Sequence, residues 1–185
     1  MKRTRWQSKN FVIGCRIPKN FFITGGVGES NITIHAGSYH LALKDAGIEM
    51  CNVVTYSSIL PSIASEIKRP SKLVHGSVME TIMAVASSKK GQRSTAGIIF
   101  GWLYDKKSGK KYGGLVCEYN GHIAEAVARK RLTQSIQELY TNGFSDNFNL
   151  RDIQTVSKSF IPKKKFGTAI VALCFTTYVV PVLKK

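Results

Sequence analysis

The sequence predicts a single α+β domain, in which helices pack on layered, mostly antiparallel sheets. The chain has 185 residues, which is the length of one ordinary domain. Its apolar segments divide into about six or seven strand-like runs but only two runs with helical spacing. Short polar turns join several neighbouring strand-like runs. This order favours antiparallel hairpins over the alternating strands and helices of a doubly wound fold.

The composition is that of a globular protein with an unusually basic surface. A hydrophobic fraction of 43% and a charged fraction of 21% exclude wholesale disorder. The 27 lysines and arginines outnumber the 11 acidic residues, and the net charge of +16 predicts long-range attraction to polyanions. A nucleic-acid-binding module is therefore one alternative. It is the less favoured one, because the lysines are scattered in turns and no RNA- or DNA-binding signature accompanies them.

We expect no zinc site from the cysteines, and no secretory signal or membrane helix from the two ends of the sequence. The four cysteines, at positions 15, 51, 117 and 174, form no CxxC pair, so reduced thiols in a cytosolic protein are favoured over a zinc site. The apolar piece at 11–15 is ended by Arg16 and is too short for a secretory signal. The uncharged run 166–183 is rich in β-branched and aromatic residues. We expect one long buried strand there, or two short ones, and no membrane helix.

The first third of the chain is expected to contain strands on either side of one helix. Residues 20–36 are typical of a strand, a glycine turn and a second extended piece. Helical spacing follows over 37–46, with Gly47 as the C-cap. Residues 48–60 are typical of a strand that runs into Pro61.

The rest of the chain combines strands with one long helix. Strands are expected at 74–86, 95–104 and 115–120. The polar segment 105–114 predicts a hairpin turn between the last two of these strands. The strongest helical pattern covers 122–141. Residues 147–161 are ambiguous and end in a strand, before the last strand region at 166–183.

Two local features are candidates for chemistry but are weak evidence by themselves. The glycine-rich segment 25–30 lacks the lysine of a phosphate-binding loop and does not open onto a helix, so a tight turn is favoured over a phosphate cradle. His35 and His40 are five residues apart and cannot share one helix face as metal ligands, while His75 and His122 have no partner signature. We therefore expect no metal site.

Several short motifs, taken in order, resemble the pyruvoyl-dependent arginine decarboxylase family. The most specific pieces are SSILP at 57–61 and CEY at 117–119. The matching segments are 24–30, 44–48, 52–61, 75–76, 113–119 and 165–167. With gaps, the resemblance spans residues 16–178. The basic N-terminal segment and the lysine-rich turn at 105–111 lie outside the pattern.

The resemblance implies a four-layer αββα sandwich and a self-processing enzyme. In this family the chain cuts itself between two hydroxyl residues, here Ser57 and Ser58, which gives a β chain of residues 1–57 and an α chain of residues 58–185. The Ser58 hydroxyl would attack the Ser57 carbonyl, and Asn52 matches the asparagine that would bind the resulting oxyanion. Elimination and loss of ammonia would convert residue 58 into a covalently bound pyruvoyl group, which is the implied cofactor.

The resemblance also assigns the proton chemistry. The ketone of the pyruvoyl group would react with the substrate amine and accept electrons as carbon dioxide leaves. Glu118 matches the proton donor of the family, and we expect it to act in turnover and not in self-cleavage. Without the resemblance, Glu118 would more simply be a solvent-facing carboxylate on a strand.

The substrate-binding residues depart from the family pattern at one position. The family converts arginine to agmatine and carbon dioxide, and His40 stands where the family has an aspartate that pairs with the guanidinium. We assign substrate binding to His40, Gly47 and Glu29, with Glu49 or a neighbouring subunit as other sources of a carboxylate. Because imidazole cannot replace a carboxylate in that pair, a different amino-acid substrate and a non-catalytic homologue are the alternatives.

The resemblance further implies a homotrimer, or a hexamer made of two trimers, with active sites at subunit interfaces. The expected partners are therefore a small amino acid and further copies of the chain. No membrane is expected as a partner, and nucleic acid is disfavoured.

Overall fold

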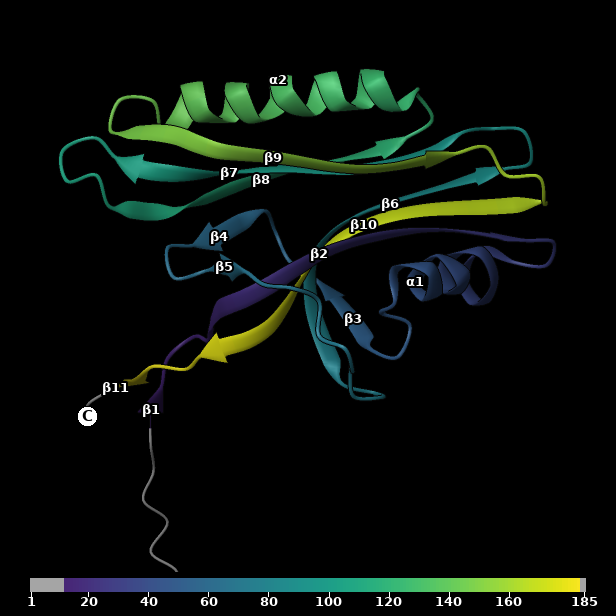
Figure 1. Cartoon of the computed structure of the whole chain (residues 1–185), viewed down its shortest axis with the longest axis horizontal. Helices are drawn as coiled ribbons and strands as arrows, with labels where there is room; N and C mark the ends of the chain where they lie inside the picture. Colours follow the sequence, from purple (N-terminus) through teal and green to yellow (C-terminus); the bar gives the residue numbers. More distant parts are fainter. Residues whose placement is uncertain (1–11, 184–185) are drawn as a thin grey trace, which may run out of the picture.

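The computed structural model describes residues 12–183, and these residues form two main sheets covered by helices (Figure 1). The five-stranded sheet contains, in spatial order, β3 (Asn52–Thr55), β6 (Val78–Lys89), β10 (Phe166–Val179), β2 (Ile17–Ser30) and β5 (Ser65–Glu66). The four-stranded sheet contains β4 (Ile59–Pro61), β8 (Lys111–Gly121), β7 (Ser94–Asp105) and β9 (Phe148–Phe160). All strand pairs are antiparallel except β3 with β6 and β2 with β5.

The layers follow the order helix, sheet, sheet, helix, which confirms the α+β class and the αββα sandwich (Figure 1). The helix α1 (His40–Ala46), which continues a π-helical turn at Ile34–Tyr39, packs on the five-stranded sheet. The helix α2 (Glu125–Gly143) packs on the four-stranded sheet through Leu132 and Ile136. The largest core lies between the two sheets, where Phe21 meets Phe100 edge to face at 6.0 Å.

The uncharged run near the C-terminus is a strand that is buried on both faces. Along β10, Val171 and Leu173 contribute to the core between the sheets, while the alternate residues Ile170 and Ala172 contribute to the core under α1. A strand covered on both faces has no polar face, and this explains the continuous apolar sequence. The short strand β11 (Val182–Leu183) follows it. None of the described helices is long and apolar enough to cross a membrane.

The glycine turn predicted near residue 25 is wrong, because β2 runs straight through it from Ile17 to Ser30. The glycines serve helix packing instead of chain reversal. A Cβ atom at Gly26 would lie 2.3 Å from the backbone oxygen of Ala42, and one at Gly28 would lie 2.3 Å from that of Ser38. Because glycine has no Cβ atom, the helical segment can lie directly on the strand. Because the segment is a continuous strand, it does not form a phosphate-binding loop.

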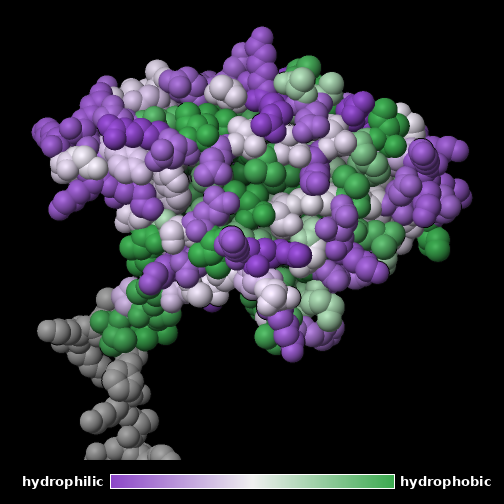
Figure 2. Space-filling model, in the orientation of Figure 1, coloured by the Kyte–Doolittle hydropathy of each residue, from purple (hydrophilic) through white to green (hydrophobic). Residues whose placement is uncertain are grey.

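The described chain ends meet in a small antiparallel ladder that projects from the sandwich. The strand β1 (Val12–Ile13) pairs with β11, with Val12 opposite Leu183. Hydrophobic side chains gather where this ladder leaves the body (Figure 2), among them Ile13 and Val182, which are both exposed.

Candidate active site

The two hydroxyl residues of the SSILP motif lie where the chain crosses from one sheet to the other. The strand β3 belongs to the five-stranded sheet and β4 to the four-stranded sheet, and residues 56–58 join them. The crossing is fixed at both ends. The Tyr56 N–H donates to the Thr81 carbonyl on β6 at 2.7 Å, and the Val116 N–H on β8 donates to the Ser58 carbonyl at 3.1 Å.

A tight turn surrounds the peptide bond between Ser57 and Ser58. The Ile59 N–H donates to the Ser57 carbonyl oxygen at 3.0 Å, which closes a three-residue turn centred on Ser58. This carbonyl is the one that the Ser58 hydroxyl would attack. A backbone donor is therefore already in place where negative charge would develop. Because every residue type except proline carries a backbone N–H group, no sequence pattern could have identified this donor.

Asn52 does not contact that carbonyl within one chain. Its side-chain amide donates to the Gly76 carbonyl at 2.9 Å, and its backbone N–H donates to the Ser77 carbonyl at 2.8 Å. Asn52 begins β3, whereas Ser57 follows the other end of that strand. At about 3.3 Å per residue, roughly 10 Å separates the Cα atoms of Asn52 and Thr55 alone. The structure thus places Asn52 at the distant end of the strand.

The structure brings Ser58 and Glu118 together. The Ser58 Oγ donates a hydrogen bond of 2.6 Å to Glu118 Oε1, and both side chains are half-buried. Glu118 lies on β8, in the sheet that the chain enters after the crossing. A length of 2.6 Å is typical of a hydroxyl that donates to a carboxylate. Glu118 can therefore remove the hydroxyl proton, a role in self-cleavage that the family resemblance alone does not give it.

The cysteine beside Glu118 is not a competing base or nucleophile. Burial, with the nearby Glu118 charge as the second cause, raises the pKa of the Cys117 thiol to about 11. A thiol with this pKa is protonated at neutral pH, and the thiolate is the reactive form. Of the two side chains, Glu118 is therefore the one suited to proton transfer near Ser58.

Two small cavities flank the crossing. One, of about 320 Å³, is lined by Arg16, Ile17, Pro18, Tyr56, Ser57, Ile59 and Pro61. The other, of about 360 Å³, is lined mainly by apolar residues of β4, β7 and β8 together with Tyr112 and Phe144. None of the described residues lining either cavity has a carboxylate. A guanidinium bound here would thus need an acid from elsewhere.

His40 and Gly47 lie at the two ends of α1, away from the crossing. His40 is exposed and lines an open cavity of about 580 Å³ together with His35, Tyr39 and Glu49. Gly47 ends the helix with a φ of 69°, as the sequence predicts for a C-cap. Glu49 shares this cavity with His40, whereas Glu29 lines a different one.

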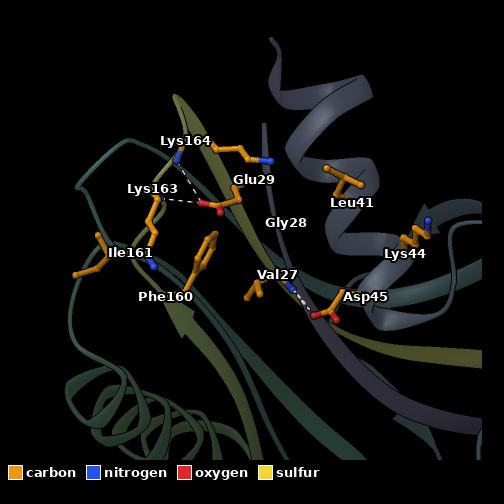
Figure 3. A pocket seen from close by; sticks show the side chains of 10 residues that line it. All are labelled: Val27, Gly28, Glu29, Leu41, Lys44, Asp45, Phe160, Ile161, Lys163 and Lys164. Atoms are coloured by element: carbon orange, nitrogen blue, oxygen red, sulfur yellow. Dashed lines mark hydrogen bonds between the residues drawn. The ribbon is translucent and has the colours of Figure 1, made fainter. Parts of the chain in front are cut away.

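Glu29 lies in a different and larger cavity of about 790 Å³ (Figure 3). Its carboxylate already accepts backbone hydrogen bonds from Lys163 at 2.7 Å and from Lys164 at 3.3 Å. Asp45, in the same cavity, accepts the Val27 N–H at 2.9 Å. Glu29 therefore holds a loop in place, and the structure separates it from His40. Within residues 12–183, no three His, Cys, Asp or Glu residues are grouped as metal ligands would be.

Comparisons with known proteins agree on one family. The family described as pyruvoyl-dependent arginine decarboxylase matches residues 20–180. The chain is 33% identical over 192 residues to the pyruvoyl-dependent arginine decarboxylase AaxB of Chlamydia abortus, with 89% of this chain and 94% of the relative covered. It is 33% identical over 187 residues to AaxB of Chlamydia muridarum, with the same coverage of both chains. A pyruvoyl-dependent arginine decarboxylase of Methanocella arvoryzae is 34% identical over 127 residues, or 63% of this chain and 75% of the relative.

Proposed function

Because the chain belongs to the pyruvoyl-dependent arginine decarboxylase family, we propose that it cuts itself between Ser57 and Ser58 and then converts arginine to agmatine and carbon dioxide. The cofactor of the family is a pyruvoyl group that is covalently bound and derived from a serine. One observation carries the assignment to this site: the Ser58 hydroxyl donates to the Glu118 carboxylate at 2.6 Å across the sheet crossing. This hydrogen bond joins a nucleophile to a base beside a turn that exposes the scissile bond.

The residues at the crossing supply the groups needed for the acyl shift. Glu118 takes the proton of Ser58 Oγ, and the oxygen attacks the Ser57 carbonyl. The Ile59 N–H stabilises the charge on the carbonyl oxygen, and the Val116 N–H holds the next carbonyl and so fixes the turn. The acyl group of Ser57 moves from the nitrogen to the Oγ of Ser58, and the nitrogen takes up the proton. Elimination then breaks the Cβ–Oγ bond of residue 58 with loss of its Cα proton, and water replaces the nitrogen, which leaves as ammonia, to give the ketone.

The surroundings of Ser58 fit a pyruvoyl group at this position. Residue 58 is half-buried, its carbonyl is held by Val116, and its side chain points at Glu118. When present, the group supplies an electron sink for the leaving carboxylate. Glu118 would then hold a proton next to residue 58 and deliver it to the substrate carbon.

We further propose that the substrate site is completed by a second copy of the chain, in a trimer or a hexamer. The cavities beside Ser58 offer no carboxylate from their described lining, while His40, Glu49 and Asn52 lie elsewhere on the same chain. Exposed apolar side chains surround β3, among them Met50, Val54 and Val78. Contact between copies through this surface would cover these side chains and bring the separated groups to Ser58.

Because His40 is not a carboxylate, one alternative to arginine decarboxylation is the decarboxylation of another amino acid. The guanidinium of arginine is read best by a carboxylate that makes two parallel hydrogen bonds. Glu49, in the cavity of His40, is the residue that we assign to this role. If Glu49 does not reach the substrate, an amino acid without a cationic side chain becomes the better candidate.

The intact mass of the purified protein tests the proposal. Denatured wild-type protein is expected to give two chains, residues 1–57 and 58–185, and the larger chain should react with a hydrazine at its ketone. Ser58→Ala should remain one chain, because no hydroxyl is left to attack. Ser62→Ala, which removes an exposed hydroxyl four residues away, should be cut like the wild type. A wild-type chain that stays uncut in an active preparation would refute self-cleavage.

A further inference from the structure

A buried carboxylate pairs with a residue of the cavity that contains Ser57, and it has no part in the chemistry described so far. Glu80, on β6, is only 3% exposed. One of its oxygens pairs with Arg16, and the other is buried without a hydrogen-bond partner in the described chain. An ion taken out of water is costly unless it is well paired. The attraction of the buried Glu80 carboxylate therefore holds the Arg16 guanidinium in place.

One aromatic ring also contacts the guanidinium. Arg16 lies over the ring of Tyr178, with its central carbon 5.5 Å from the ring centre. Burial, followed by the neighbouring Tyr56, raises the pKa of Tyr178 to about 12, although Arg16 opposes the shift. Tyr178 is thus neutral at physiological pH, and it adds no negative charge. The charges of this cluster are those of Arg16 and Glu80.

Arg16 also borders the cleavage site. It lines the cavity of about 320 Å³ that contains Tyr56 and Ser57, and it is the one charged residue in the described lining of that cavity. The backbone explains the proximity, because Tyr56 donates to the carbonyl of Thr81, which is the residue after Glu80. The Arg16 side chain is 57% exposed, so its pairing with Glu80 leaves N–H donors that face the cavity and solvent.

Self-cleavage would create a new charge in this cavity. After the acyl shift, elimination breaks the Cβ–Oγ bond of Ser58, and the electron pair leaves with the oxygen while a base takes the Cα proton. Ser57 then ends in a free carboxylate, made of its former carbonyl oxygen and the former Oγ of Ser58. A neutral peptide group has been replaced by an anion next to a guanidinium.

We propose that Arg16 binds the new C-terminal carboxylate of Ser57 and holds the end of the 1–57 chain in place after the cut. The inference rests on the self-cleavage proposed above. A guanidinium carries five N–H donors in a planar fork and can serve two carboxylates at once. Glu80 orients the fork from the core, and the Ser57 carboxylate occupies donors on the open side. Arg16 is thus a positioning residue that keeps the cut chain end away from residue 58.

The test compares the loss of thermal stability in the cut and the uncut protein. Arg16→Gln is made in the wild type, which cuts itself, and in Ser58→Ala, which does not. The loss of the Glu80 pairing is common to both backgrounds and cancels. We expect Arg16→Gln to lower the Tm of the cut protein by about 3–10 °C more than that of the uncut protein. Lys19→Gln, an exposed cation on the same stretch of chain, should lower both equally.

A second measurement needs no variant. A carboxypeptidase should trim residues from the Ser57 end of cut wild-type protein slowly at low salt and faster at about 1 M salt, where charge pairing at the surface is screened. Equal Tm losses in the two backgrounds, or trimming that ignores salt, would overturn the role of Arg16 while leaving self-cleavage intact. A wild-type chain that intact mass shows to be uncut would instead overturn self-cleavage and this inference together.

Discussion

At the scale of single residues, the hydrogen bond between Ser58 and Glu118 supports two successive tasks for one carboxylate in the proposed mechanism. Before the proposed cut, the carboxylate would accept the proton of the attacking hydroxyl. The proton passes on to the amide nitrogen as the acyl group leaves it, so Glu118 would take up a new proton from solvent before each turnover. The two proposed tasks need the same position beside residue 58 and opposite protonation of the carboxyl group.

Glu118→Gln should impair both tasks. The amide can still accept the Ser58 hydrogen bond, but it cannot take or deliver the proton. We expect slower self-cleavage, followed on denaturing gels over time, and turnover per cut chain lower by about 10²–10⁴-fold, followed by carbon dioxide release.

Glu125→Gln is the matched control for this change. Glu125 also accepts a serine hydrogen bond of 2.6 Å, from Ser157, but on the outer face of the four-stranded sheet. Its substitution should leave both rates unchanged. Normal cleavage and normal turnover in Glu118→Gln would show that the protons come from another group.

Substitution of His40 tests which amino acid is the preferred substrate. If a carboxylate is needed at this place to read a guanidinium, His40→Asp should raise kcat/KM for arginine by about tenfold or more and should not do so for a neutral amino acid. His122→Asp adds the same charge in a distant loop and corrects for the change in net charge. A wild-type enzyme that strongly prefers arginine and gains nothing from His40→Asp would direct attention to Glu49.

At the scale of elements, the contact between α1 and β2 depends on two glycines. A Cβ atom would lie 2.3 Å from a backbone oxygen of α1 at Gly26, and 2.3 Å from a backbone oxygen of the π-helical turn before α1 at Gly28. The helix would have to move, and the core beneath α1 would open. We expect Gly26→Ala or Gly28→Ala to lower the free energy of unfolding by about 1–3 kcal/mol, measured by denaturant unfolding.

Gly143→Ala is the control for these glycines. Gly143 ends α2 and does not have a positive φ, and a Cβ atom at this position would meet no neighbouring group within 4 Å. Alanine should therefore be neutral there or stabilise the protein slightly, because alanine favours helix. Losses of equal size at Gly26 and Gly143 would mean that helix contact does not explain the glycines of β2.

The positions of strands and helices were predictable where the hydrophobic periodicity was regular. The predictions failed where packing or a bulge disrupted that periodicity. The strands β6 and β7 and the helix α2 lie close to their predicted bounds, whereas β8 begins at Lys111, inside the segment 105–114 that the sequence predicts to be a turn. Residues 147–161 were ambiguous because β9 contains a bulge: Asp152 has a φ of 52°, and the register with β7 shifts between Phe100 and Trp102. An extra residue in one strand offsets the alternation by one, and the period of two is lost from the sequence.

The candidate active site could also be predicted only in part from the sequence. The motif containing Ser58 and the one containing Glu118 could be named from the sequence through the family resemblance. Their contact could not, because it joins residues 60 positions apart across two sheets. The donor at Ile59 and the cation at Arg16 depend on a turn and a buried acid that no local pattern reveals.

At the scale of the whole molecule, the proposed assembly can be tested at the exposed edge strand β3. Val54 is 46% exposed on this strand, so Val54→Asp should be tolerated by a single copy of the chain but not by an interface. We expect a native mass of three or six copies of the protein for the wild type, each copy counted with both of its cut chains, and a smaller mass with little activity for Val54→Asp. The native mass is measured by light scattering at about 0.3 M salt, because salt at this concentration screens the repulsion between these basic proteins.

Val127→Asp provides the control for the assembly test. Val127 is similarly exposed, at 47%, but lies on α2 at the outer face of the other sheet. This variant should keep the wild-type mass and activity. A wild-type protein that is active as a single copy would rule out a shared site.

The projecting ladder of β1 and β11 has a topological consequence. Val12 and Leu183 are paired neighbours, so a short hairpin loop could join them. The proposed cut opens the chain between residues 57 and 58. The processed protein is therefore related to a circular permutant, a chain that begins at residue 58, passes through the new loop and ends at residue 57. Such a permutant would keep every strand pairing of the sandwich without any peptide bond having to break, and it would separate the ability to fold from the ability to self-process.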